Sequence, residues 1–352
     1  MGKEKLEKEI KKCQLLKKEI KHIDIKLFDS RPIIESMEEM AFQARNLARA
    51  AKIYDKMLSE DEVTIILCLA GSLFSAGLKK VVVDLIKYNM VDVIVSSGAI
   101  IVDQDFFEAL GFRHYHGTPY SDDEMLRRMN IDRIYDTFID ENELRVCDMT
   151  VARIADSLPP HPYSSRQFIK AMGEYLYKNR PATESVVLEC YKRNIPIFVP
   201  AFSDCSAGFG LIYHQQKRGK EPRLSIDSAK DFLELTRIKI KATDTGLVMV
   251  GGGVPKNFVQ DTTVAADVLG HQVNMHKYAI QITVADERDG ALSGSTLKEA
   301  HSWGKIGGGF EQMVFCEATI AFPLLASYVY HRGSWKGRKP KCYNSFLDEV
   351  ES

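Results

Sequence analysis

The chain of 352 residues lacks the features that mark several large classes of protein. Its seven cysteines are scattered and include no CxxC pair, which argues against a disulfide framework or a cysteine-rich zinc site and fits a reducing compartment. Lysine and arginine number 47 against 48 for aspartate and glutamate, so charge indicates neither a nucleic acid nor an anionic membrane. No apolar run reaches the roughly 18 residues of a membrane span, and the lysine- and glutamate-rich N-terminus predicts a helix rather than a signal peptide. These absences favour a cytoplasmic enzyme or binding protein without a metal, whose partner is a small molecule or a protein.

Standard nucleotide-binding motifs and domain linkers are missing too. No segment reads GxGxxG or GxxxxGK[ST], so neither the common dinucleotide fingerprint nor the P-loop is present. No stretch rich in proline, glycine or serine divides the chain, and there is no internal repeat. We therefore predict a helical extension at residues 1–28, one large domain at 29–335 and a C-terminal tail at 336–352.

Apolar, β-branched runs alternate along the chain with helical patterns. The runs that predict strands are 63–70, 91–98, 195–201, 247–253 and 278–285. The segments with helical periodicity between them include 34–58, 74–89, 164–178 and 228–239. Continuous apolar strands separated by helices of this length are typical of parallel sheets covered on both faces. The predicted fold class is therefore α/β: a Rossmann-like, doubly wound, mostly parallel sheet with helices on both faces.

Two segments stand apart from this alternation. Residues 3–27 place Ile10, Leu15 and Ile20 at helical spacings among charges of both signs, which predicts an amphipathic helix. A packing or subunit-contact arm is the simpler role for it, and the mixed charges argue against a membrane surface. Residues 111–143 are the least regular segment, and we expect a lid or an insertion over the carboxyl ends of the strands.

Glycines and other small residues follow the predicted strands. Such segments are 71–77, 96–99, 202–208, 251–257 and 286–290. Ligands of open α/β sheets bind beyond the carboxyl ends of the strands, where backbone N–H groups and helix N-termini can hold a phosphate. One such turn is ordinary turn chemistry, but several at successive strand ends favour a nucleotide-sized ligand. Asp204 and Asp289 are then candidates for ribose hydroxyls, with loop capping as the alternative.

One lysine stands in an unusual setting. In the segment 299-EAHSWGKIGGG-309, Lys305 follows Trp303 and Gly304 and precedes a run of glycines. A lone lysine is usually a solvated surface charge, but these neighbours allow a ligand to approach the amine closely. A lysine that is partly desolvated against an aromatic ring loses basicity and can form an imine. Together with a nucleotide-shaped site, this leaves two chemistries open: imine formation on pyridoxal phosphate, or imine transfer driven by a nicotinamide.

Several segments together resemble deoxyhypusine synthase in their order and spacing. They are 90-MVDVIVSSGA-99, 195-IPIFVPAFSD-204, 249-MVGGGVPKN-257, 289-DGALSGSTLKEAHSWGKI-306 and 321-AFPLL-325. The likeness runs from about residue 30 to 330, and the string E-A-x-S-W-G-K-I is highly specific to that family. Members are Rossmann-like NAD enzymes that assemble as homotetramers, with active sites at the interfaces of paired subunits. The resemblance therefore implies that residues 29–335 form an NAD-binding catalytic domain.

The resemblance implies an NAD-dependent transferase of alkyl groups. In that family, hydride transfer to NAD oxidises the secondary amine of spermidine, diaminopropane leaves, and the aminobutyl group is captured as an imine on a lysine. The imine then passes to an acceptor amine and is reduced by the retained NADH. In deoxyhypusine synthase the acceptor is a lysine of a translation initiation factor, whereas a free diamine as acceptor would yield homospermidine.

Residue by residue, the likeness makes Lys305 the nucleophile that forms the imine. Glu299 and Trp303 would hold the cationic polyamine by ion pairing and by stacking. The further substrate-binding candidates are Gly290, Asn257 and Asp261. The NAD contacts would fall on Gly71, Ser72, Ser75, Ser97, Gly98, Ala99, Asp204, Gly252, Val284, Ala285, Asp289 and Glu317.

The chain departs from the family pattern at positions that would touch the substrate. Phe209 and Leu292 replace acids that normally grip a substrate ammonium, and Asn257 replaces a histidine that helps proton transfer. Asp261 stands where the family has asparagine. Since an unpaired buried ammonium costs several kcal/mol, we expect the substrate pocket to be rebuilt while the NAD site and Lys305 remain.

Three polar residues are candidates to replace the lost groups: Asp261, Glu287 and His301, each with surface placement as the alternative. The leading prediction is an NAD-dependent aminobutyl transferase with a polyamine donor and, as acceptor, a protein lysine or a small amine. The rebuilt pocket slightly favours the small amine. The alternative is a catalytically silent paralogue that binds NAD and serves as a regulatory or structural subunit.

Overall fold

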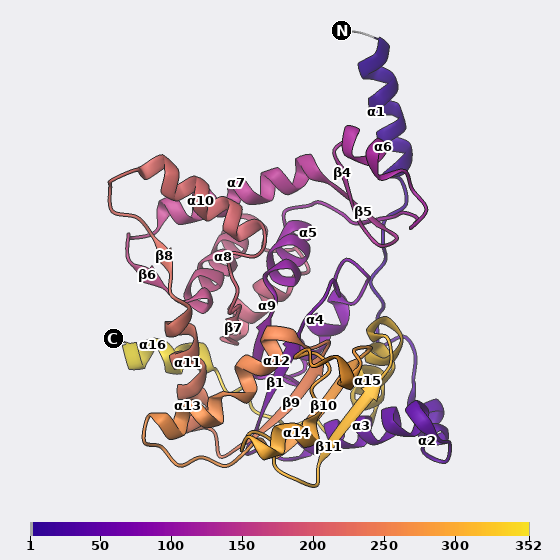
Figure 1. Cartoon of the computed structure of the whole chain (residues 1–352), viewed down its shortest axis with the longest axis vertical. Coiled ribbons are helices and arrows are strands. Elements are labelled where there is room, and N and C mark those ends of the chain that lie inside the picture. Colours follow the sequence, from indigo (N-terminus) through magenta and orange to yellow (C-terminus); the bar gives the residue numbers. More distant parts are fainter. Residues whose placement is uncertain (1–2, 352) are drawn as a thin grey trace.

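The computed structural model describes residues 3–351 and is built around one parallel sheet (Figure 1). Its six strands lie in the order β11-β10-β9-β1-β2-β7, and every neighbouring pair is parallel. Their bounds are β1 Val63–Leu69, β2 Val93–Ser96, β7 Ile197–Phe198, β9 Asp244–Val250, β10 Tyr278–Thr283 and β11 Glu311–Phe315. Numbered along the chain and read from β7, the strands follow the order 3-2-1-4-5-6 of Rossmann sheets. The strand order reverses between β1 and β9, and this fold places its ligand crevice beyond their carboxyl ends.

Alternate strand residues enter two separate cores, one on each face of the sheet. Along β1, Ile65 and Leu67 belong to one core, whereas Ile66 and Cys68 belong to the other. The first face is covered by α2 Arg31–Glu38, α3 Phe42–Ser59, α4 Lys79–Lys87, α9 Val186–Arg193 and α15 Ala318–Arg332. The second face is covered by α11 Ser228–Lys241, α12 Gly253–Gln260, α14 Leu297–Ser302 and α16 Tyr343–Glu351. The prediction of a doubly wound α/β fold is therefore confirmed.

A group of helices lies beyond the β7 edge of the sheet. Figure 1 shows these helices, α7 Glu141–Ser157, α8 Ser165–Asn179 and α10 Ser206–Arg218, together at one end of the molecule. α7 and α10 approach closely at Gly210, where a Cβ would lie 2.6 Å from the carbonyl oxygen of Asp148. The remaining elements of the main body are the π-helix η1 Ala99–Phe106, α5 Phe107–Ala109, the short strands β6 Pro162–Tyr163 and β8 Ser225–Ile226, α13 Thr262–Val268 and the 3-10 helix η2 Glu287–Asp289. Among residues 3–351, no helix is both long and apolar enough to cross a membrane.

Residues 111–143 form a small antiparallel sheet rather than an irregular loop. Its strand order is β3-β5-β4, with bounds β3 Tyr115–His116, β4 Ile131–Ile134 and β5 Thr137–Asp140, and α6 Asp123–Arg128 precedes β4. The β4–β5 turn, residues 134–137, lines a cavity at the carboxyl ends of the main strands. The segment is thus an insertion that reaches over the strand ends, as expected.

The amphipathic helix predicted over residues 3–27 is too long. α1 spans Lys3–Leu15 and projects from one end of the molecule (Figure 1). The chain then runs along the insertion, where the N–H of Ile20 donates to the carbonyl of His114 at 2.8 Å. Hydrogen bonds to a distant segment therefore replace the helical ones that the periodicity predicted.

Two further elements differ from the sequence-based predictions. The helix predicted over 34–58 is divided into α2 and α3, since Phe42 takes a left-handed conformation with φ 57°. β11 has no counterpart among the predicted strands, because it begins with Glu311 and Gln312 and lies at the edge of the sheet.

The predicted C-terminal tail packs against the core as far as Leu347. Arg338 is 6% exposed and donates to Asp92 at 2.9 Å. The hydroxyls of Tyr343 and Thr64 bond at 2.7 Å, which ties α16 to the first strand of the sheet. The chain after residue 335 therefore completes the second face of the sheet.

Candidate active site

A cavity of about 760 Å³ lies beyond the carboxyl ends of β1, β9 and β10. We term it the strand-end cavity. Its wall consists largely of backbone and small side chains, with the β4–β5 turn on one side. Because the strand order reverses between β1 and β9, the cavity occupies the ligand crevice of this fold. Most of the predicted NAD contacts line it: Gly71, Ser72, Ser75, Gly252, Val284, Ala285 and Glu317.

Close backbone packing shapes this cavity. Gly71 has φ 99°, and a Cβ built on it would meet no atom within 4 Å, so this position faces open space. A Cβ on Gly252 would lie 2.5 Å from Cα of Ser293, so no larger residue fits there without a backbone shift. The N–H of Ser75 donates to Oε1 of Gln104 at 3.0 Å, which holds the first strand-end turn in place. The shape of the cavity therefore depends on the absence of side chains at Gly71 and Gly252.

The predicted contacts after β2 do not line this cavity. Gly98 packs tightly, since a Cβ there would lie 2.5 Å from Sγ of Cys205. Ala99 begins a π-helical segment, Ala99–Phe106, that leads away from the strand end. Within residues 3–351, Oγ of Ser97 is buried without a hydrogen-bond partner. Ser97 thus retains an unused hydroxyl at the end of β2.

The two aspartates proposed for ribose also lie outside the strand-end cavity. Asp289 accepts a hydrogen bond from the N–H of Ala291 at 2.6 Å, which is the loop-capping role. Asp204 is exposed in the turn before α10. Within this chain, neither aspartate lines the cavity that holds most of the predicted NAD contacts.

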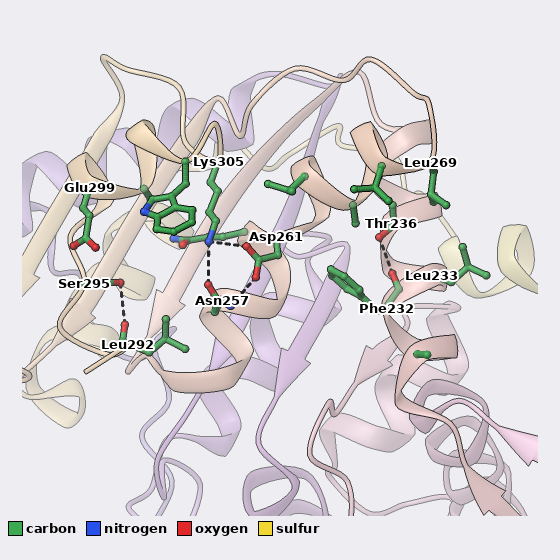
Figure 2. A pocket seen from close by; sticks show the side chains of 17 residues that line it. Phe232, Leu233, Thr236, Asn257, Asp261, Leu269, Leu292, Ser295, Glu299 and Lys305 are labelled. Carbon is green, nitrogen blue, oxygen red and sulfur yellow. Dashed lines mark hydrogen bonds and ion pairs between the residues drawn. The ribbon is translucent and has the colours of Figure 1, made fainter. Parts of the chain in front are cut away.

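A second cavity, of about 770 Å³, lies on the second face of the sheet between α11, α12, α13 and α14 (Figure 2). We term it the lysine cavity, because Lys305 lines it together with the predicted residues Asn257, Asp261, Glu299 and Trp303. Figure 2 shows a largely apolar wall opposite Lys305 and Glu299. That wall includes Phe232, Leu233, Val264, Val268 and Leu269.

Lys305 is a part-buried amine and not a solvated surface charge. Its side chain is 12% exposed, and Nζ lies 2.6 Å from Oδ1 of Asp261. Nζ also donates to Oδ1 of Asn257 at 3.2 Å, and Nδ2 of Asn257 donates to Asp261 at 2.7 Å. The three side chains close a triangle, which fixes the direction of the amine (Figure 2).

The other polar groups of the lysine cavity suit a cation. Nζ of Lys305 lies 5.3 Å from the ring centroid of Trp303, whose face is otherwise open because the residue is 65% exposed. Asp261 and Glu299 are the two carboxylates of the lining, and Lys305 is its one cation. This excess of negative charge favours a ligand that carries ammonium groups.

Residues 292–295 border both cavities, and we term them the partition. Ser293 lines the strand-end cavity, whereas Leu292 and Ser295 line the lysine cavity. Gln281 on β10 holds the partition by donating to the carbonyl of Ser293 at 3.0 Å. The two cavities therefore lie on either side of this short segment.

Lys256 on α12 forms hydrogen bonds to the partition. Its Nζ donates to the carbonyl of Leu292 at 3.3 Å, to Oγ of Ser295 at 3.1 Å and to the carbonyl of Ser295. Burial lowers the pKa of Lys256 to about 8, and the carboxylate of Glu299 opposes this shift. The sequence marked the glycines before Lys256 but not this lysine, because a solvated lysine is the ordinary expectation.

Some residues proposed for the substrate pocket lie elsewhere. Gly290 is exposed in a left-handed conformation and lines neither cavity, and Phe209 is 55% exposed on α10. Glu287 and His301 also line neither cavity. Of the three candidates for replacement polar groups, the structure brings only Asp261 to Lys305.

The wall formed by α11 has no counterpart among the sequence-based predictions. It consists of Ala229, Phe232, Leu233 and Thr236, which lie on one face of the helix at spacings of three and four residues. The periodicity is visible in the sequence, but an apolar stripe is usually a core face. Only the position of α13 shows that part of this stripe faces a cavity.

The strand order and the two cavities define a Rossmann-type α/β protein with a ligand crevice and a neighbouring lysine site. The family model for deoxyhypusine synthase matches residues 32–329. The chain therefore belongs to the deoxyhypusine synthase family, a family of transferases, and the resemblance seen in the sequence is confirmed.

Relatives and a solved structure agree with this assignment. A "Deoxyhypusine synthase-like protein" of Chlorobaculum tepidum is 59% identical over 343 residues, which cover 97% of this chain and 98% of that protein. A protein of the same name from Coxiella burnetii is 59% identical over 340 residues, 96% of each chain. The structure of a "putative deoxyhypusine synthase" from Entamoeba histolytica aligns with a TM-score of 0.60 and 20% identity over 89% of this chain and 97% of that chain. At that identity the structural likeness supports the fold alone.

Proposed function

We propose that the chain is an NAD-dependent aminoalkyl transferase that oxidises a polyamine such as spermidine and transfers its aminobutyl group through an imine on Lys305. Membership of the deoxyhypusine synthase family supports this reaction class. The observation that carries the proposal is the setting of Lys305, whose part-buried amine lies 2.6 Å from Asp261 in a cavity that shares the partition with the strand-end cavity.

NAD is proposed for the strand-end cavity, and the residues there fit it. Gly71 faces open space at the end of β1, and α12 begins at Gly253, shortly after the end of β9. Backbone and a helix N-terminus of this kind suit a diphosphate. Gly71, Ser72, Ser75 and Gly252 would hold the cofactor. When bound, NAD supplies the hydride acceptor for the donor amine and the hydride donor for the product.

The side chains of the lysine cavity supply the transfer chemistry. Lys305 must lose a proton before its amine attacks, and Oδ1 of Asp261 is placed to accept that proton. The new bond joins Nζ of Lys305 to the oxidised carbon of the donor, and the bond from that carbon to the leaving diamine breaks. The acceptor amine then replaces Nζ on the same carbon, and Lys305 regains its proton. Asn257, which accepts a hydrogen bond from Nζ, would orient the amine of Lys305 when it attacks the donor and when the acceptor amine replaces it.

A free diamine is the acceptor that we favour, with a protein lysine as the second candidate. Glu299 is the carboxylate of this cavity that is not paired with Lys305, and it provides an anionic position for an ammonium group of a short diamine. Trp303 offers an open ring face for the alkyl chain or an ammonium group. With putrescine as acceptor the product would be homospermidine.

We further propose a cytoplasmic homotetramer with active sites at subunit interfaces. The proposal follows the family and is supported by an apolar surface on α10, where Phe209, Ile212 and Tyr213 are 55%, 64% and 48% exposed. An exposed apolar face of this kind favours a subunit contact. Light scattering after size exclusion would give the mass in solution, and a stable monomer that turns over substrate would contradict the proposal.

The central experiment follows the aminobutyl group. The protein is incubated with NAD and radiolabelled spermidine, with and without putrescine, and is then reduced with borohydride. We expect label on the peptide that contains Lys305, and a new labelled polyamine when putrescine is present. Mass spectrometry of the amines and of the peptides measures both.

Two matched variants make the result specific. Lys305→Arg keeps the charge but removes the nucleophilic amine, so it should carry no label. Lys298→Arg changes an exposed lysine on α14 and should behave like the wild type. NAD binding without label on Lys305 and without a new polyamine would exclude the transferase and leave the silent NAD-binding paralogue.

A further inference from the structure

His276 is fully buried and pairs with the loop that carries Lys305. Its N–H donates to the carbonyl of Lys305 at 2.9 Å, and its carbonyl accepts from the N–H of Gly307 at 2.8 Å. These two bonds enclose Lys305 and Ile306 in a strand-like pairing just before β10. The main chain of His276 therefore fixes the backbone from which the reactive amine extends.

The ring of His276 belongs to a chain of buried hydrogen bonds in which each donor and acceptor can be assigned. Nε2 lies 3.2 Å from the carbonyl oxygen of Val259, and since a carbonyl only accepts, Nε2 carries the hydrogen. Nδ1 then accepts from the hydroxyl of Thr245 at 2.8 Å. Oγ1 of Thr245 in turn accepts from Nζ of Lys239 at 2.8 Å. The network requires a neutral imidazole, and burial, followed by the charge of Lys239, keeps the pKa of His276 well below its usual range.

The partner of the ring matters because of the helix to which it belongs. Val259 lies on α12, which carries Asn257 and has Asp261 as its C-terminal cap. Those two side chains hold Nζ of Lys305 at 3.2 and 2.6 Å. A single residue thus fixes both the backbone of Lys305 and the helix that presents the partners of its amine.

We propose that His276 is a positioning residue for Lys305, which sets the distance between its amine and Asp261 by joining the lysine loop to α12. The expected effect of His276 on turnover rests on the proposed function. Its effect on the position of the Lys305 amine rests on the hydrogen-bond geometry alone. His276 does not line the lysine cavity, so it acts through its neighbours and not on the substrate. A side chain of similar volume without polar atoms would fill the space but remove the hydrogen bond from this ring to the carbonyl of Val259 on α12.

The first test compares His276→Leu with His276→Gln. A displacement of about 1 Å at a reacting group can reduce the rate about 100-fold, so His276→Leu should lower kcat by that order while KM changes by no more than about threefold. The amide of glutamine can still donate to the carbonyl of Val259. We therefore expect His276→Gln to recover at least about tenfold of the lost kcat.

A second measurement does not require turnover. Pyridoxal phosphate followed by borohydride labels accessible amines, and peptide mass spectrometry gives the rate at Lys305. We expect this rate to change by at least about threefold in His276→Leu and to return toward the wild-type rate in His276→Gln. Failure of the wild type to transfer an aminobutyl group would thus refute the proposed function without deciding the role of His276.

His214 provides the matched control. It is 1% exposed, bonds Asp156 through Nδ1 at 2.7 Å and accepts from the N–H of Leu224 through Nε2 at 3.3 Å, but it lies on α10 outside both cavities. His214→Leu should lower the melting temperature as a buried polar loss does, while kcat and the labelling of Lys305 stay within about twofold of the wild type.

A folded His276→Leu protein with wild-type kcat and labelling rate would overturn the proposal, as would equal losses in His214→Leu. If His276→Leu does not fold, Thr245→Val decides the question. Valine keeps the shape of threonine and removes only the hydroxyl that donates to Nδ1, so we expect a smaller change of kcat and labelling in the same direction. No change in a folded Thr245→Val protein would then refute the role of the ring.

Discussion

The two cavities are nearly equal in volume, about 760 and 770 Å³, but they are built from different materials. The strand-end cavity is lined largely by small residues at the carboxyl ends of three parallel strands. The lysine cavity is lined largely by residues of four helices and of the loops that follow and precede α14. A site made of backbone tolerates little variation, because a single Cβ at Gly252 would meet the partition. A site made of side chains can change its chemistry through single substitutions.

The departures from the family pattern follow this division. Of the four departures, Leu292, Asn257 and Asp261 line the lysine cavity, none lines the strand-end cavity, and Phe209 lies outside both on α10. Asp261 and Asn257 now bind the amine of Lys305 together. Under the proposed function, these substitutions would alter the amine specificity and leave the proposed cofactor site unchanged.

The largest expected effect separates the two cavities functionally. Lys305→Met keeps most of the side-chain length but removes the amine, so we expect turnover to fall by at least about 1,000-fold while NAD still binds. Lys298→Met, on the exposed side of α14, should leave both unchanged. Mass spectrometry of the amines and calorimetric titration of NAD measure the two properties. Loss of NAD binding in Lys305→Met would show that the cavities are not independent.

The next effect tests the rebuilt polar group. Asp261→Asn preserves shape but removes the carboxylate that is to accept the proton of Lys305, and we expect kcat to fall by about 100-fold or more. Glu287→Gln alters an exposed acid that lines neither cavity, and should change kcat by less than about twofold. Steady-state assays with the best amine pair measure both. Equal effects would show that Asp261 has no special role.

A smaller effect concerns the partition that both cavities share. Lys256→Met leaves the carbonyls of Leu292 and Ser295 without their donor, which should lower the free energy of unfolding by about 1–3 kcal/mol near neutral pH. The folded-state pKa of Lys256 is about 8 against 10.5 for an ordinary lysine, so the unfolded chain binds more protons between these values. The contribution of Lys256 to stability therefore rises with pH across that window.

Urea unfolding at about pH 7 and about pH 10 measures this difference. We expect the stability gap between the wild type and Lys256→Met to widen at the higher pH. Lys298→Met, whose lysine is exposed, should show a constant gap. A gap that narrows with pH would contradict the lowered pKa.

The smallest expected effect comes from a comparison of two glycines that both have a positive φ angle. Gly71 and Gly111 have φ 99° and 111°, and a Cβ on either would meet no atom within 4 Å. Alanine at each should cost about 1–2 kcal/mol of stability through backbone strain. Only Gly71 lines the strand-end cavity, so only Gly71→Ala should weaken NAD binding, by about tenfold. Equal affinities for the two variants in an NAD titration would place the cofactor elsewhere.

Sequence patterns predicted the main sheet better than the pieces around it. The runs at 63–70 and 278–285 became β1 and β10 with nearly the same bounds, since continuous apolar stretches are a strong signal. The helix predicted over 3–27 ends at Leu15, because the following residues bond to the insertion instead. β11 was not predicted, because it begins with the polar residues Glu311 and Gln312 and so lacks a continuous apolar run.

The candidate site shows the same limit. Lys305, Trp303 and Glu299 were identifiable because they lie within seven residues of one another in a distinctive string. The contact between Lys305 and Asn257 joins residues 48 positions apart, and only the family likeness suggested it. The periodicity of α11 was visible but indicated an ordinary core face, and Lys256 and His276 were not singled out, since such residues have ordinary roles in most proteins.

The sequence by itself determined the fold class and the family and identified Lys305 as the candidate nucleophile, because these depend on periodicity and on short local strings. Only the tertiary structure decided that Asp261 and not Glu287 or His301 pairs with Lys305, and that Phe209 lies away from it on α10. It also decided that His276 joins the lysine loop to α12. The physical reason is that such pairings arise from the packing of whole helices against the sheet, where many weak contacts act together and no local pattern records the result.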